Sequence, residues 1–274
     1  MKVRYKKDET YNYDYVKIIK YNKNHYKAIQ FKYRVKQAGF EKEKRDLNLK
    51  VDIESLIEKS PISIEHLMQS ISRTKKTVYE YALCNDFDFF ITLTFDRKKY
   101  DSSDLKELKR IVGQWLSNYK KRINPNIKYL IIPELHKDNK HFHFHGLISN
   151  INDITEFKKS RKGIMRYNWT PWHDKFGFTS LEEIRDKDAV SKYITKYITK
   201  DVIQTFNKHR YLCSKGLKKP KTIFEITHYI EEMPCDFEND FVRIKNLNSY
   251  EEFYNELMKI GEHIEDTGGM SMWN

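Results

Sequence analysis

Apolar residues recur at every second position in some stretches of the chain and at every third or fourth position in others, which predicts both strands and helices. The strands predicted from this pattern are residues 15–21, 25–35, 87–95, 127–134, 176–179 and 222–228. The predicted helices are residues 62–84, 103–122, 151–159, 186–206 and 249–266, of which the second is capped by Ser103. Residues 41–60 are expected to form a linker or a short helix, and residues 161–175 a basic, tryptophan-containing loop.

The most informative stretch is residues 141–145, with the sequence HFHFH. In a strand, alternation by two places the three imidazoles on one face and both phenyl rings on the other. The segment 127–134 just upstream is strand-like, and Asp138 and Asn139 between the two segments form a typical turn dipeptide. We therefore expect a hairpin with one hydrophobic face and one face that carries histidines.

The register of this hairpin decides whether a carboxylate joins the histidines. If the turn is centred between Asp138 and Asn139, Glu134 faces His143, and it shares that face with His145. Directly opposed residues lie about 4.5–5.5 Å apart at their Cβ atoms. Two imidazoles and a carboxylate can hold a divalent metal ion. A loop one residue longer or shorter would break this parity and move Glu134 to the opposite face. Two alternative interpretations are that the histidines form the polar outer face of an edge hairpin, or that they belong to a structural zinc site.

The charge and the aromatic content indicate a polyanionic partner. The chain of 274 residues has a formal net charge of +12, and 14% of it is aromatic, including 19 tyrosines, which suits stacking on unpaired bases. Residues 1–50 hold 15 Lys or Arg against 6 Asp or Glu. The hairpin predicted there, in which lysines alternate with apolar residues, either follows a phosphate backbone or is a solvated edge that prevents aggregation.

The cysteines and the apolar runs exclude several classes of protein. Cys84, Cys213 and Cys235 are widely spaced and form no C-x-x-C pair, so neither a disulfide framework nor a cysteine-based zinc cluster is expected. No apolar run is long enough to span a membrane, and the basic N-terminus leads into no signal peptide. We therefore expect a cytoplasmic protein without a membrane partner.

The predicted helix 186–206 contains a tandem repeat, YITK at 193–196 followed by YITK at 197–200. Helical spacing places the tyrosines on the border of an apolar stripe and gives each tyrosine a lysine at i+3. That stripe consists of Val190, Ile194 and Ile198. The alternative interpretation is that these are ordinary boundary tyrosines with packed rings and solvated hydroxyls.

Attack of a tyrosine on phosphorus needs help, because the reference pKa of its hydroxyl is near 10. A neighbouring cation favours the phenolate, and a Lewis acid polarises the phosphate. The lysines of the repeat offer the first, and a metal ion at Glu134, His143 and His145 would offer the second. The sequence therefore combines the groups needed for phosphoryl transfer to tyrosine.

Three segments in this order resemble motifs one, two and three of the HUH endonucleases: FITLTF at 90–95, HFHGL at 143–147 and YITKYITK at 193–200. Among these enzymes the chain is most similar to rolling-circle replication initiators of plasmids and of isometric and filamentous phages, the gene A and gene II type. Residues 79–89 and 172–178 also fit that group, so the resemblance covers about residues 70–205.

The resemblance implies an α+β fold, with a central antiparallel β-sheet flanked by helices in a catalytic domain at 61–205. It leaves a basic N-terminal extension at 1–60 and a C-terminal extension at 206–274. It makes His143 and His145 ligands of Mg²⁺ or Mn²⁺, with Glu134 as the third ligand. The tyrosines Tyr193 and Tyr197 become candidate nucleophiles. The lysines that would position or activate them and the phosphate are Lys196 and Lys200.

The activity implied is site-specific nicking and rejoining of single-stranded or locally melted origin DNA in a bacterial host. A tyrosine would keep the 5′ phosphate as an ester and release a 3′-OH that primes synthesis. Two active tyrosines could alternate between cleavage and strand transfer, and a single active one is equally compatible with the repeat. The sequence has no phosphate-binding loop of an NTPase, so a host helicase is expected to unwind the DNA and a host polymerase to extend the primer.

Other interpretations remain open at this point. An HUH transposase or relaxase shares the same residues. A DNA-binding module without catalysis would use the histidines structurally, and its tyrosines would pack or stack on bases. His141 adds a third histidine, so a metal site of His141 and His143 is an alternative to His143 and His145. Thr92 and Thr94 are expected to be structural or to contact DNA. The sequence makes no prediction of oligomeric state.

Overall fold

The computed structural model describes residues 4–5, 15–32, 35–36, 64–159, 163–199, 210–226, 233–249, 251 and 255. The chain divides into two compact units, one made of residues 50–219 and one made of residues 1–49 together with 220–274. The predictions for residues 41–60, for residues 200–206 and for most of 249–266 lie outside the described residues.

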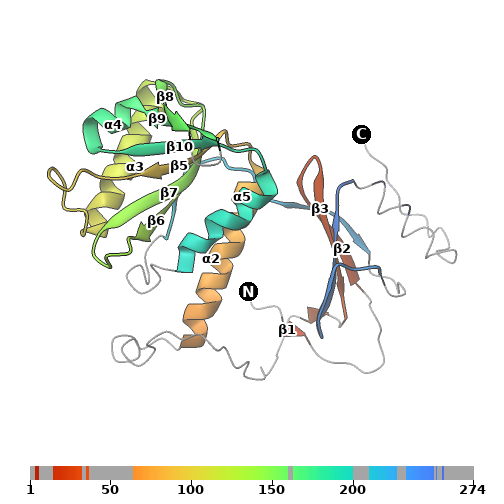
Figure 1. Ribbon diagram of the computed structural model, residues 1–274. Helices are drawn as coiled ribbons and strands as arrows, with labels where there is room; N and C mark the ends of the chain where they lie inside the picture. Colours follow the sequence, from red (N-terminus) through yellow and green to blue (C-terminus); the bar gives the residue numbers. More distant parts are fainter. Residues whose placement is uncertain are drawn as a thin grey trace. The chain divides into compact units, whose positions relative to one another are not determined.

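The larger unit is built on a seven-stranded antiparallel sheet with the order β11-β6-β7-β5-β10-β9-β8 (Figure 1). Its strands are β5 (Phe89–Leu93), β6 (Lys128–Leu135), β7 (Phe142–Ser149), β8 (Ile154–Lys159), β9 (Met165–Trp169), β10 (Thr179–Glu183) and β11 (Leu212–Cys213). This confirms an α+β architecture with an antiparallel sheet.

Helices pack on both faces of this sheet. One face is covered by α3 (Leu105–Arg122) and α4 (Thr170–Phe176), whose side chains enter the larger hydrophobic cluster. The other face is partly covered by α2 (Ile64–Cys84), α5 (Lys187–Ile194) and the short 3₁₀ helix η1 (Thr195–Thr199). Among the described residues, no helix is both long enough and apolar enough to cross a membrane.

The alternation in β7 separates the two faces as predicted. Phe142 and Phe144 are buried in the cluster beneath α3 and α4, whereas Leu147 belongs to the cluster beneath α2 and α5. The histidines at 143 and 145 share the face of Leu147, because side chains two residues apart point the same way. The histidine face is therefore the one on which α2, α5 and η1 lie.

Two predictions for the segment after this hairpin are wrong. Residues 154–159 are the strand β8 rather than part of a helix, because Asn150 and Asp153 adopt positive φ angles of 58° and 59° that stop a helix from forming across them. Residues 165–175 are not a loop but β9 and most of α4.

The predicted cap of α3 is also wrong by one residue. The cap is Asp104 rather than Ser103, since the Asp104 carboxylate accepts the backbone N–H of Glu107 at 3.0 Å. The Ser103 hydroxyl instead donates to the carboxylate of Asp101 at 2.6 Å. The helix itself ends at Arg122, as predicted.

The predicted strand 176–179 is displaced, because Phe176 ends α4 and β10 begins at Thr179. Gly177 makes the connection with φ of 137°. A Cβ atom there would lie 2.6 Å from the backbone nitrogen of Asp96 and 2.7 Å from the carbonyl oxygen of Thr94. Only glycine fits this close approach, which packs the end of α4 against the chain that leaves β5.

The second unit holds a five-stranded antiparallel sheet with the order β12-β2-β3-β14-β13. The predicted N-terminal hairpin is confirmed as β2 (Tyr15–Asn22) and β3 (His25–Phe31). It is flanked by the C-terminal strands β12 (Lys221–Ile226), β14 (Val242–Leu247) and β13 (Phe237–Glu238), and a two-residue pair, β1 (Arg4–Tyr5) with β4 (Val35–Lys36), lies outside this sheet. The segments before and after the central unit thus form one sheet.

Candidate active site

The pairing of β6 with β7 has the register expected from the sequence. Glu134 is opposite His143 and Ile132 is opposite His145, and beyond the strand ends the backbone N–H of His136 donates to the carbonyl of His141 at 2.7 Å. The turn carries Asn139 at φ of 54°. The predicted parity is therefore confirmed, and Glu134 lies on the histidine face.

Glu134 and His145 are in direct contact. Nε2 of His145 lies 2.7 Å from Oε2 of Glu134, and both side chains are largely shielded, with 14% and 15% of their surface exposed for His145 and Glu134, respectively. His143 lies one pleat further along the same face, with its ring centroid 4.7 Å from that of His136. The structure thus places the three predicted ligands on one face of two adjacent strands, with Glu134 and His145 in contact.

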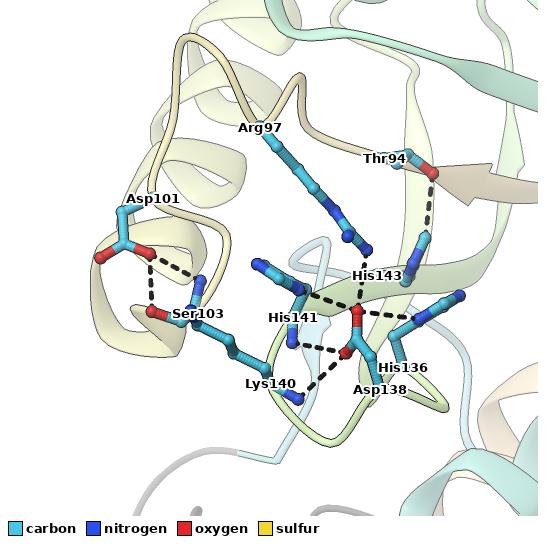
Figure 2. Close-up of polar contacts among 9 residues, drawn as sticks. All are labelled: Thr94, Arg97, Asp101, Ser103, His136, Asp138, Lys140, His141 and His143. Atoms are coloured by element: carbon cyan, nitrogen blue, oxygen red, sulfur yellow. Dashed lines mark hydrogen bonds and ion pairs between the residues drawn. The ribbon is translucent and has the colours of Figure 1, made fainter.

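Two threonines, one in β5 and one just after it, contact the other side of each imidazole. The Thr92 hydroxyl lies 3.1 Å from Nδ1 of His145, and the Thr94 hydroxyl lies 3.1 Å from Nδ1 of His143 (Figure 2 shows the second contact). A hydroxyl can donate to a ring nitrogen or accept from it, so each threonine suits either tautomer of its histidine. The spacing of Thr92 and Thr94 matches that of the histidines, because β5 pairs directly with β7.

The environment holds His143 neutral. Its pKa is lowered to about 4, chiefly by burial and then by the nearby His136, His145 and Arg97, against a smaller opposing effect of Glu134. A neutral imidazole keeps one unprotonated nitrogen, which is the form that binds a metal ion. The His143 ring is therefore chemically suited to ligation at neutral pH.

The geometry of a metal site is not fully formed. Within the ranges that the structure describes, no group of three or more His, Cys, Asp or Glu side chains is arranged so that it could hold a metal ion. The contact between Glu134 and His145 occupies two of the atoms that would serve as ligands. A carboxylate is a ligand that suits Mg²⁺ and Mn²⁺, whereas imidazoles are more typical ligands of transition metal ions, so the donor set suits a divalent ion.

One tyrosine of the tandem repeat contacts His145, and the other contacts that tyrosine. The ring of Tyr197 stacks on the His145 ring with centroids 4.2 Å apart and an interplanar angle of 14°. The Tyr197 hydroxyl donates to the Tyr193 hydroxyl at 2.9 Å. The two residues differ in exposure, since Tyr197 is 9% exposed and Tyr193 is 45% exposed.

The acidity of Tyr197 is reduced by its surroundings. Burial raises its pKa well above the ordinary value, and the hydrogen bond to Tyr193 and the charge of Glu134 act in the same direction. Lys196 stands over the ring of Tyr193, with Nζ 5.3 Å from the ring centroid. Lys200, the other predicted lysine, lies outside the described residues.

The helix that carries the tyrosines begins as predicted and ends earlier. Asp186 caps α5 by accepting the backbone N–H of Ala189 at 2.9 Å. The α-helix stops at Ile194 and continues as η1. Ile194 and Ile198 are buried in the cluster beneath α2, with Val190 packed against it, which confirms the apolar stripe.

Asp138, which the sequence places in the turn, contacts several neighbouring polar side chains. Nδ1 of His141 lies 2.8 Å from Oδ2 of Asp138, and Nδ1 of His136 lies 3.2 Å from the same oxygen. Nη2 of Arg97 donates to this oxygen at 3.0 Å (Figure 2). His145 thus contacts Glu134, while His141 contacts Asp138. In the sequence, Asp138 can be recognised only as part of the turn dipeptide with Asn139. No local pattern marks Arg97 as its partner.

Residues 88–202 match the model of the family of replication-associated proteins of the ORF2 and gene II protein type. No curated protein and no solved structure gives a significant match. The matched range runs from the residue before β5 to just beyond η1, so it includes the threonines, Glu134, the histidines and both tyrosines. This similarity to replication-associated proteins supports a role in DNA replication, and with it DNA binding.

Proposed function

We infer that the protein initiates rolling-circle replication by nicking and rejoining one strand of single-stranded or locally melted origin DNA with the help of Mg²⁺ or Mn²⁺. One observation carries this proposal. The Tyr197 ring stacks on His145, which contacts Glu134, while the Tyr197 hydroxyl donates to the Tyr193 hydroxyl, so the tyrosine pair adjoins the histidine face. The family match over residues 88–202 supports it independently.

Glu134, His143 and His145 would hold the metal ion. When bound, the ion would act as a Lewis acid that polarises the scissile phosphate. The threonine hydroxyls at Nδ1 are the kind of partner that orients a metal-bound imidazole. For His145 to offer Nε2 as a ligand, its proton must sit on Nδ1, where the Thr92 hydroxyl oxygen can accept it.

Tyr193 is the better placed of the two tyrosines to attack DNA first. It is 45% exposed, its hydroxyl accepts the hydrogen bond from Tyr197, and Lys196 lies over its ring. Tyr197 is buried, and its raised pKa disfavours the phenolate that would attack phosphorus. Its stacked ring and its hydroxyl instead hold Tyr193 in place, and it can accept the second strand transfer once the first tyrosine is occupied.

The nicking reaction transfers a phosphoryl group from the 3′ oxygen of DNA to tyrosine and needs no oxidant or reductant. The oxygen of Tyr193 bonds to phosphorus and loses its proton, while the bond from phosphorus to the 3′ oxygen breaks. That oxygen takes up a proton and becomes the 3′-OH primer, and the 5′ phosphate stays on tyrosine as an ester. The energy of the phosphodiester bond is thus kept in the ester, which allows rejoining when a 3′-OH attacks it.

The partners follow from this chemistry. The substrate we assign is a single strand, which the resemblance to the HUH endonucleases implies and which the high aromatic content suits. Unwinding and extension are assigned to a host helicase and a host polymerase, since the sequence contains no phosphate-binding loop of an NTPase.

The test is covalent attachment of labelled DNA. The protein is incubated with end-labelled single strands from its own replicon, with Mn²⁺ or with EDTA, and run on denaturing gels. We expect an adduct only with Mn²⁺, none with Tyr193→Phe, and slower formation with Tyr197→Phe. Tyr167→Phe is the matched control, because its hydroxyl bonds Glu183 at a distant position of the sheet. Failure of every fragment to form an adduct would favour a DNA-binding module without catalysis.

A further inference from the structure

A cationic pocket lies at the end of the hairpin, beside the candidate active site. It has a volume of about 390 Å³ and is lined by the loop 97–102 together with Lys140 and His141. Four of the lining side chains are cations, Arg97, Lys98, Lys99 and Lys140, and one is a carboxylate, Asp101. The pocket therefore suits an anion, and the proposed function does not use it.

The two carboxylate oxygens of Asp138 hold the turn and the Arg97 side chain in position. Oδ1 accepts the backbone N–H groups of Lys140 and His141, each at 3.0 Å, and so shapes the turn. Oδ2 takes the side chains instead: Nη2 of Arg97 at 3.0 Å, Nδ1 of His141 at 2.8 Å and Nδ1 of His136 at 3.2 Å. Figure 2 shows Arg97 reaching from its loop to the hairpin, so that this single carboxylate ties the two segments together.

The cations of the pocket have donors left for a ligand. Arg97 uses one nitrogen for Asp138, and a guanidinium has five N–H donors in all. The Nζ atoms of Lys98 and Lys140 make no ion pair with any residue that the structure describes. The nearest carboxylate to Lys99 Nζ is that of Asp96 at 4.0 Å, which is the limit of an ion pair.

The loop that lines the pocket is joined to the strands that carry the histidines. The loop that forms it leaves β5 directly after Thr94, whose hydroxyl contacts His143. The backbone N–H of Phe142 donates to the carbonyl of Ser102 at 2.8 Å, which fixes the loop to the start of β7. His141 and His145 are four residues apart in an extended chain, a distance of about 13 Å. The tyrosines stand at the His145 end and the pocket at the His141 end.

We propose that this pocket binds a backbone phosphate of the single strand close to, but not adjacent to, the phosphate that is cut, and that Asp138 is a positioning residue for Arg97. This inference rests on the proposed function, which supplies the strand. A phosphate is the anion that Arg and Lys side chains recognise most readily in DNA, and its contacts place the strand without reading sequence. A strand held at the His141 end and running along the hairpin would present a phosphate further along to the histidines and the tyrosines.

The direction in which Asp138→Asn changes the affinity for DNA distinguishes this proposal from attraction by net charge alone. Asp138→Asn keeps a carbonyl oxygen for the turn and replaces the other oxygen by an amide that donates, so Arg97 no longer has its acceptor. If the pocket attracts DNA only through net charge, removing a carboxylate strengthens binding, and Asp101→Asn does the same. If Asp138 positions Arg97, its variant weakens binding. Asp101 is the matched control, because it lines the pocket while its carboxylate accepts from Ser103 rather than from a cation.

The experiment measures the dissociation constant of a fluorescent oligothymidylate of about 20 nucleotides, which covers the site of a single-strand-binding domain. It is done in EDTA over a series of salt concentrations, so that no cleavage occurs. We expect Asp138→Asn and Arg97→Ala each to weaken binding about tenfold. Each should lower the slope of log K against log salt by about 0.7, the value for one phosphate of a single strand. The double variant should resemble Arg97→Ala alone.

Several results would overturn the proposal. Unchanged or stronger binding by Asp138→Asn, or equal effects of Asp138→Asn and Asp101→Asn, would mean that Asp138 does not position a phosphate contact. A further weakening in the double variant would mean that Asp138 acts other than through Arg97. Circular dichroism of each variant checks that the fold is kept. Covalent attachment with Mn²⁺ is measured separately, so that failure of the proposed nicking activity is distinguished from failure of this inference.

Discussion

Replacing Thr94 by valine tests whether the two threonines at 92 and 94 prepare the histidines for a metal ion. Valine has nearly the shape of threonine and is favourable in a strand, so the change removes the hydroxyl and little else. It removes the hydrogen bond of 3.1 Å between the Thr94 hydroxyl and Nδ1 of His143. Thr92→Val removes the equivalent hydrogen bond to His145.

The expected effect on metal binding is larger than the effect on stability. A hydrogen bond of this kind contributes about 0.5–1.5 kcal/mol to the free energy of unfolding. Partners that orient a metal-bound imidazole change metal affinity by about 10–100-fold, because the ring must otherwise be fixed by the ion itself. We therefore expect each variant to bind Mn²⁺ about 10–100-fold more weakly, while its free energy of unfolding falls by about 1 kcal/mol.

Isothermal titration calorimetry with Mn²⁺ measures the first quantity, and urea denaturation measures the second. Thr155→Val, in the edge strand β8 and exposed, is the control for removal of a hydroxyl. Mn²⁺ affinity equal to that of the unmodified protein in both Thr92→Val and Thr94→Val would refute the reasoning. So would an equally weakened affinity in the Thr155→Val control.

Three further predictions concern stability and DNA binding. His143 has a folded-state pKa of about 4 against an ordinary value of 6.5, so the unfolded chain binds more protons between these pH values and stability falls as the solution is acidified through that window. Since the ring is half-buried, the decrease is about 1–2 kcal/mol, and it should be smaller in His143→Gln when urea midpoints at pH 7 and pH 4.5 are compared. Phe144→Ala removes a fully buried ring behind the histidines, so the free energy of unfolding should fall by about 3–5 kcal/mol, seen as a lower melting temperature. A fall in the free energy of unfolding of less than about 1 kcal/mol would contradict the packing described. Phe157 and Phe178 are 49% and 42% exposed with ring centroids 5.6 Å apart, so alanine at either should weaken single-strand binding by about 1–3 kcal/mol if bases stack there, while alanine at the exposed Phe237 of the other unit should not.

The hairpin at the centre of the site could be predicted from local features alone. Alternation fixes which side chains share a face, and a short turn at Asp138 and Asn139 leaves a single register that buries both phenylalanines. The convergence of Glu134 with His145 follows from that register. The same reasoning placed Tyr193 and Tyr197 on one side of a helix, where their hydroxyls meet.

The segment after the hairpin shows where periodicity misleads. Ile151, Ile154 and Phe157 have helical spacing, but the positive φ angles of Asn150 and Asp153 turn the chain back as an edge strand. That strand gains its stability from pairing with β9, which the local sequence does not indicate. Tertiary pairing thus overrides a weak helical pattern.

Contacts between distant residues could not be predicted from the sequence. Arg97 and Asp138 are joined only because the loop after β5 crosses the end of the β6–β7 hairpin. Likewise, β14 pairs with β3 although more than two hundred residues separate them in the chain. The local sequence of each segment therefore gives no indication of which distant segment it contacts.

The measurement that tests the central claim most directly is identification of the residue that becomes attached to DNA. Trypsin is unsuitable, because the repeat yields the same peptide, YITK, from 193–196 and from 197–200. Cleavage before aspartate instead releases residues 188–200, which hold both tyrosines, and fragmentation in a mass spectrometer locates the nucleotide. The proposed mechanism predicts a nucleotide on Tyr193 after a single round of cleavage with Mn²⁺. A nucleotide on a residue outside this repeat, or a nicked strand with no attached residue, would contradict it.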